Sequence, residues 1–240
     1  MDNTNFSRNI KDLEDSYETG TLNRKSHWRK YQTAVKYARK VKITEEEIDI
    51  LGRIDEFFFD SWNVPKFSIK VGTLLFSVGV LISEILYFLA FYFSVDFWFS
   101  VILFFLISFV NFMLSHTVIH CIFGFLLGLN FRNYFIFKST FRKSNLLAWT
   151  PITKLPIFGI KYDLSSFLSV SKWKRSLMFI SAPILSWIWF LLNFIPLYIF
   201  HSNQILILQY LGIVISIIFV FSQLIGFFFY GDFWKARQDY

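Results

Sequence analysis

The chain has 240 residues, of which 55% are hydrophobic and only 17% are charged. Soluble domains carry roughly 25% charged residues, so the composition excludes an ordinary soluble domain and predicts an integral membrane protein embedded in the lipid bilayer. The net charge of +7 does not point to nucleic acid as a partner, because basic loops hold the cytoplasmic side of membrane proteins. The single cysteine, Cys121, excludes an intrachain disulfide and a cysteine-based zinc site.

Residues 1–68 are polar and nearly neutral, and we interpret them as a cytosolic N-terminal helical region. Thr44 is followed by three glutamates, which is the pattern of an N-cap with acids in the first turn. It predicts a helix from Thr44 to Asp60, before Pro65 breaks the chain. The segment 25–42 has apolar residues at helical spacing among basic ones. This pattern fits a helix on an anionic membrane surface and equally a small helix packed on its neighbour.

Residues 69–235 form a predicted membrane domain with four spans, each near the roughly 20 residues that cross a bilayer. The expected fold class is all-α, with four transmembrane helices in two hairpins joined by a long loop, 130–175. Short polar turns close the hairpins. The expected spans are Ile69–Phe93, Phe97–Gly128, Leu177–Phe200 and Ile205–Tyr230.

The distribution of basic residues predicts the orientation of these spans. The loop 130–175 carries many lysines and arginines but one acid, Asp163, whereas the turns 94–96 and 201–204 carry no Lys or Arg. The positive-inside rule therefore places the loop and both termini in the cytoplasm. The loop is too long for a simple connector, and we expect it to form short strands or to lie at the membrane interface.

The sequence "HTVIH" carries the chemistry of the second span. His116 and His120 are four residues apart, so both lie on one helix face and can converge on a metal ion. The spacing is that of the zinc-protease motif H-E-x-x-H, but Thr117 occupies the glutamate position. Asp232, at the end of the fourth span, is the candidate third ligand. The predicted topology puts all three ligands near the inner membrane face.

The order of features over residues 70–235 resembles the zincin peptidase family of four-span membrane proteins, distant relatives of the site-2 intramembrane metalloproteases. The resemblance rests on "HTVIHCIFGFLLG", on "SLMFISAPIL" with its Ala-Pro step, and on "GD" at the end of the fourth span. It implies a zinc ion held by His116, His120 and Asp232. It also implies transmembrane helices of other membrane proteins as partners.

Thr117 stands in place of the glutamate that acts as the general base in this family. Threonine has no group that titrates near neutrality, and general acid–base help is worth roughly 10²–10⁴ in rate. We therefore expect a zincin-like membrane protein that is non-catalytic or weakly active. One alternative is an active intramembrane metallopeptidase with Asp163 or Glu84 as a substitute base. Another is a non-catalytic scaffold or assembly subunit that uses residues 1–68 for docking.

Simpler interpretations of the same residues remain open at this point. The two histidines also fit an interhelical hydrogen-bonded pair without metal. Glu84 is expected inside the first span, where a carboxyl group hydrogen-bonded between helices is the simplest explanation. Asp232 also fits a helix-terminal residue paired with Lys235.

The predicted orientation is testable by cysteine labelling. A Ser202→Cys variant should react with a membrane-impermeant maleimide only from outside, and a Ser144→Cys control only from the cytoplasmic side, because the positive-inside rule places the second hairpin turn outside. Labelling of position 202 from the cytoplasmic side would contradict the topology.

Overall fold

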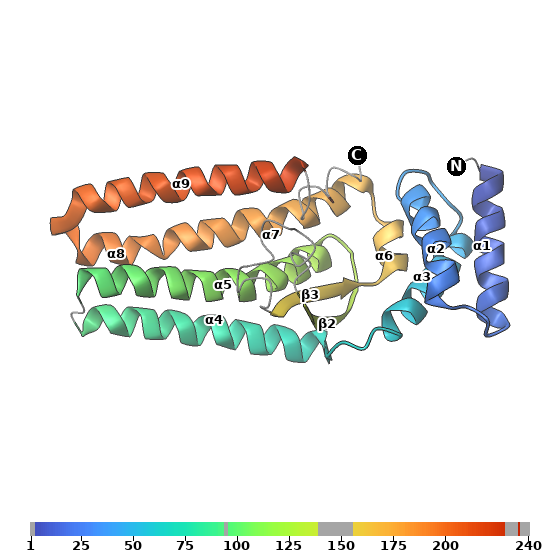
Figure 1. Cartoon of the computed structure of the whole chain (residues 1–240), viewed down its shortest axis with the longest axis horizontal. Coiled ribbons are helices and arrows are strands. Elements are labelled where there is room, and N and C mark those ends of the chain that lie inside the picture. Colours follow the sequence, from blue (N-terminus) through green and yellow to red (C-terminus); the bar gives the residue numbers. More distant parts are fainter. Residues whose placement is uncertain (1–2, 94–95, 139–155, 229–234, 236–240) are drawn as a thin grey trace.

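The computed structural model describes residues 3–93, 96–138, 156–228 and 235, and most of them form helices (Figure 1). Three helices make up the N-terminal region: α1 (Asn3–Glu18), α2 (Arg24–Ala38) and α3 (Glu45–Asp60). The predicted helix after Thr44 is confirmed. The Thr44 side chain accepts a hydrogen bond from the backbone N–H of Glu47, and the Glu47 carboxylate accepts one from the backbone N–H of Thr44.

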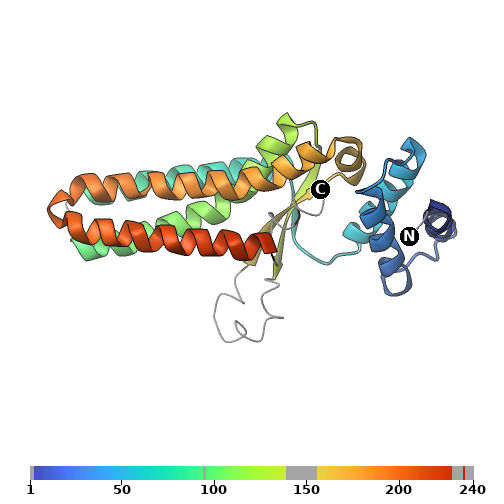
Figure 2. The same ribbon diagram turned by 90° about the horizontal axis from the view of Figure 1, so that it is seen from above.

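Long apolar helices lie side by side in the rest of the chain (Figures 1 and 2). They are α4 (Ile69–Tyr92), α5 (Phe97–Leu126), α7 (Lys172–Leu192) and α9 (Ile205–Phe228), and the short α8 (Phe194–Phe200) continues the line of α7. Among the described residues, three segments are long and apolar enough to cross a membrane, namely α4, α5 and the combined Lys172–Phe200. The short η3 (Ser202–Gln204) joins α8 to α9, which runs back along the bundle.

The third apolar segment ends at Phe200 as predicted, but it differs from its prediction at its start and in its middle. It begins at Lys172 rather than Leu177, because basic side chains of its first turn bind the end of α2. The Lys172 ammonium donates to the carbonyl of Lys40, and the Arg175 guanidinium donates to the carbonyl of Arg39. It is also interrupted at Asn193, three residues before Pro196, which has no N–H to continue the helical ladder.

The chain is mostly helical, as expected, but it also forms a three-stranded antiparallel sheet at the end of the bundle nearest the N-terminal helices (Figure 1). Its strands are β1 (Lys66–Ser68), β2 (Phe131–Lys138) and β3 (Pro156–Tyr162), in the order β1-β2-β3. The expectation of short strands in the 130–175 loop is confirmed. β1 comes from the end of the predicted cytosolic region, so this sheet joins the two parts of the chain.

The N-terminal helices share one hydrophobic core with the membrane-proximal elements. Buried residues of α1, α2 and α3 pack with Phe167 of α6 (Leu164–Ser169) and with Phe179 of α7. Tyr31, Ala34 and Ala38 of α2 are part of that core. The structure therefore favours the packed helix over the membrane-surface helix for segment 25–42.

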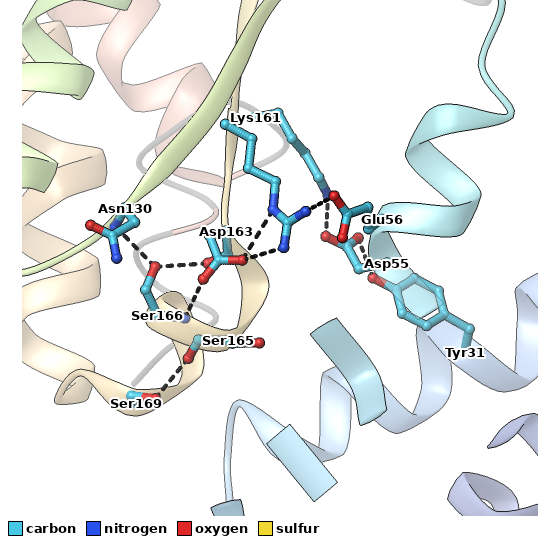
Figure 3. Close-up of polar contacts among 10 residues, drawn as sticks. Tyr31, Asp55, Glu56, Asn130, Lys161, Asp163, Ser165, Ser166 and Ser169 are labelled. Atoms are coloured by element: carbon cyan, nitrogen blue, oxygen red, sulfur yellow. Dashed lines mark hydrogen bonds and ion pairs between the residues drawn. The ribbon is translucent and has the colours of Figure 1, made fainter. Parts of the chain in front are cut away.

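Two adjacent carboxylates of α3 attach the N-terminal helices to the sheet (Figure 3). Asp55 pairs with Lys161 of β3, and Glu56 pairs with Arg132 of β2. The register passes from Phe131 opposite Tyr162 to Asn133 opposite Lys161, so Arg132 is the extra residue of a β-bulge. Bulges re-aim a side chain, and here the bulge accompanies an arginine that reaches α3.

The Asp55 pair is the more buried of the two attachments. The side chains of Asp55 and Lys161 are only 12% and 15% exposed. The Tyr31 hydroxyl donates to the other oxygen of Asp55 at 2.5 Å. Burial, together with the Asp55 charge, raises the pKa of the Tyr31 phenol well above its usual range, so Tyr31 stays protonated and remains a donor.

Removing Asp55 should loosen the N-terminal helices from the sheet. Asp55→Asn leaves the Lys161 charge buried without its partner, and breaking such a pair costs about 3–5 kcal/mol. Limited trypsin digestion of the membrane-reconstituted protein should cut α2 much faster than in the parent chain. The control is Asp49→Asn on the same helix, whose side chain is 71% exposed and whose loss should change little. Equal cleavage rates for the two variants would contradict this account.

Candidate functional site

The two histidines of α5 face each other across one helical turn. The ring centroids of His116 and His120 are 4.8 Å apart, and the ring planes are nearly perpendicular, at 89°. His120 is 6% exposed and therefore buried. The i, i+4 spacing thus brings the imidazoles together as expected, in a part of the helix that is enclosed by protein.

Contacts from α7 orient both rings. Nδ1 of His120 is 3.0 Å from the carbonyl oxygen of Met178. A carbonyl only accepts, so this nitrogen carries a proton, and in the neutral ring the lone pair is then on Nε2. Nδ1 of His116 is 3.5 Å from the hydroxyl of Ser186. A histidine that donates one N–H to a backbone carbonyl is oriented as metal-binding histidines are.

A cavity of about 310 Å³ opens at this pair. Most of its wall is aromatic and comes from the sheet and from α7. Its lining comprises His116, Thr117, His120, Phe131, Phe135, Phe137, Phe158, Gly159, Ile160, Tyr162, Met178, Phe179 and Lys235. The sheet therefore supplies the wall of the cavity that faces the histidines.

Two glycines let the sheet approach the helices closely enough to form that wall. A Cβ at Gly124 of α5 would lie 2.2 Å from the ring of Phe131, and one at Gly72 of α4 would lie 2.2 Å from the ring of Tyr134. No real side chain tolerates such distances. The hydroxyls of Tyr134 and Thr73 are 3.0 Å apart, which adds a polar tie between β2 and α4.

Thr117 lines the cavity but its hydroxyl is already engaged. It donates to the carbonyl of Leu114 at 3.2 Å, one turn back along α5. The residue is buried. Position 117 therefore faces the cavity that the histidines line, while its side chain lacks a group that can take and return a proton near neutral pH.

The third predicted ligand, Asp232, lies outside the described residues. Within the described part of the chain, no group of three or more His, Cys, Asp or Glu could hold a metal ion. Lys235, three residues after Asp232, lines the histidine cavity, and its ammonium lies 5.4 Å from the ring centroid of Phe179. The two imidazoles and their orientation fit a zinc site that needs at least one further ligand.

Asp163 and Glu84, the two acids considered as substitute bases, form hydrogen bonds with other parts of the protein. Asp163 caps α6 by accepting from the backbone N–H of Ser166 at 2.9 Å, and it accepts from Arg132 at 2.9 Å and 3.1 Å. It is not among the residues that line the histidine cavity. Glu84 accepts from the side-chain amide of Asn111 and from the indole N–H of Trp189.

Glu84 lies near the level of the histidines along the bundle. Its partner Asn111 precedes His116 by only five residues on α5. The observed contacts are those of a carboxyl group hydrogen-bonded between helices. Such contacts hold the side chain toward Asn111 and Trp189.

The sequence analysis did not identify Lys235, or most of the aromatic residues of the wall, as residues that line the cavity. Phe135 and Phe137 on β2, and Phe158, Ile160 and Tyr162 on β3, are spaced by two residues, which is the spacing of one strand face. This alternation in the sequence could have indicated the aromatic wall.

A second cavity, of about 360 Å³, shares Phe135, Ile160, Tyr162, Phe179 and Lys235 with the first and adjoins Asp55 and Lys161. The histidine cavity therefore borders the junction with the N-terminal helices.

No family model, curated protein or solved structure matches this chain. The resemblance to zincin peptidases thus stays a prediction carried by the sequence motifs. The function must be inferred from the geometry of the histidine cavity and its surroundings.

Proposed function

We propose that the chain is a zincin-like metal-binding protein of the membrane that lacks the catalytic base. The single observation that carries this proposal is the pair His116 and His120, oriented from α7 in a cavity that Thr117 also lines. In this proposal zinc binds the two imidazoles and the Asp232 carboxylate. Zinc at such a site supplies a Lewis acid.

The position of Lys235 supports Asp232 as the third ligand. Three residues of fully extended chain span at most about 11 Å, so the Cα of Asp232 lies within that distance of the Cα of Lys235. The Lys235 side chain lines the histidine cavity. The short chain length between Asp232 and Lys235 is therefore compatible with a shared site.

The proposed membrane arrangement keeps four spans, with α9 as the fourth, and both termini and the sheet on the cytoplasmic side. α9 covers Ile205–Phe228, a length of 24 residues, which is sufficient for a span. Its part with described side chains, up to Ile218, is apolar. The absence of Lys and Arg from the turn 201–204 supports this orientation.

The proposed activity is recognition of transmembrane helices of other membrane proteins, with little or no cleavage. Thr117 supplies no base, and the contacts of Asp163 and Glu84 argue against either carboxylate as a substitute. An active metallopeptidase is therefore the weaker alternative. A scaffold or assembly subunit is the second candidate, and the core that fixes the N-terminal helices to α6 and α7 favours it.

Metal analysis of the purified chain tests zinc binding. One zinc per chain is expected after equilibration with zinc and removal of excess, because two imidazoles and a carboxylate make a three-ligand site. His116→Ala with His120→Ala should lose it, as should Asp232→Asn. His27→Ala, which changes a histidine of α2, is the matched control and should retain it. Full zinc retention in the double variant would overturn the metal site.

Thr117→Glu tests the missing base. A glutamate there would supply the group that accepts and returns a proton, so cleavage of a reconstituted helical membrane substrate should rise by roughly 10²-fold or more over the parent chain. The gain should vanish in Thr117→Glu/His120→Ala. Thr117→Gln matches the size of glutamate without its charge and should stay silent. Robust zinc-dependent cleavage by the unmodified chain would contradict the proposal.

A further inference from the structure

Glu84 is a carboxylate with only one of its oxygens occupied, in the middle of a membrane helix. The Asn111 amide donates to Oε1 at 2.5 Å, and the Trp189 indole donates to the same Oε1 at 2.8 Å. Ser83 in turn donates to the Asn111 side-chain oxygen. Oε2 forms no hydrogen bond with any residue that the structure describes. Three helices thus meet at one oxygen and leave the other open.

The depth of Glu84 prevents that open oxygen from reaching water along its own helix. Glu84 is fifteen residues from the start of α4 and eight from its end at Tyr92. At about 1.5 Å per residue, the nearer end of the helix is roughly 12 Å away. A glutamate side chain is too short for that distance. An ionisable group at such depth with no cationic partner among the described residues is costly and is a functional candidate by default.

The surface around Glu84 is open and apolar. Phe88, one turn further along α4, is 55% exposed, and Trp189 of α7 is 40% exposed. Leu81, one turn before Glu84, is also exposed. α9 lies on another side of α7, because it adjoins Leu191, two residues and about 200° around the helix from Trp189. The carboxylate therefore faces the lipid side between α4 and α7.

We propose that the face of α4 and α7 around Glu84 binds a transmembrane helix of another polypeptide that carries a lysine or arginine at matching depth. A cationic donor would occupy Oε2 and neutralise the charge, which is how ionisable residues within membranes are usually stabilised. Residues 71–92, 97–126 and 176–228 contain no Lys or Arg. A second copy of this chain therefore has no cation to offer there. The inference does not depend on zinc binding.

Photo-crosslinking in nanodiscs tests the inference with the full chain. The crosslinker p-benzoylphenylalanine replaces Phe88, and the probes are two synthetic transmembrane helices of about 20 leucines. They differ in one central residue, lysine in one and its neutral isostere norleucine in the other. The lysine helix should crosslink at least about threefold more, given the strength of polar contacts between membrane helices. The same crosslinker at Phe109 of α5, an exposed position about 200° around the helix from Asn111, should show no such preference.

Glu84→Gln provides the matched variant. Glutamine keeps an oxygen for Asn111 and Trp189 but replaces the charged Oε2 with an amide, so the helices should pack as before while the lysine preference disappears. Thermal unfolding of both proteins checks that packing. The proposal is overturned if the lysine and norleucine helices crosslink equally to the parent chain, or if the preference persists in Glu84→Gln. The comparison on the parent chain decides the matter even if Glu84→Gln does not fold.

Discussion

Polar groups inside an apolar helix must find partners within the protein, because the bilayer core contains no water to satisfy them. α5 carries several such groups, and its neighbours are placed by them. Asn111 reaches Ser83 and Glu84 of α4, while His116 and His120 reach Ser186 and the Met178 carbonyl of α7. Apolar packing alone would allow these helices to rotate against one another, since lipid tails are as apolar as leucine. The polar contacts fix which faces meet.

The sheet adds what the helices alone cannot provide, a rigid wall opposite the histidines. Its aromatic residues close one side of the cavity, and Gly124 and Gly72 admit Phe131 and Tyr134 at distances that any side chain would prevent. The same strands carry Arg132 and Lys161, which bind Glu56 and Asp55 of α3. One small sheet therefore contacts both the histidine cavity and the N-terminal helices.

Local patterns predicted the parts of this structure that depend on local physics. Helix α3 follows from Thr44 and Glu47, and the imidazole pair follows from a four-residue spacing. The sheet was harder to predict because its strands pair residues that are far apart in the sequence, such as Phe67 with Tyr134. Aromatic alternation in 131–137 is a weaker signal than a 24-residue apolar run. The partners of Asp163 and Glu84 lie on other elements, and only tertiary packing decides them.

The ionisable side chains that the sequence singled out within the apolar helices lie in two different surroundings. His116 and His120 point into a cavity walled by the sheet, whereas Glu84 is held between Asn111 and Trp189 at the lipid side of α4 and α7. A base must lie within hydrogen-bond reach of the proton it moves. Glu84 could serve the histidines only by leaving two donors, and both would then lose their acceptor in a medium without water. The same argument makes Glu84 well suited to recognition, because an anchored carboxylate presents its second oxygen in a fixed direction.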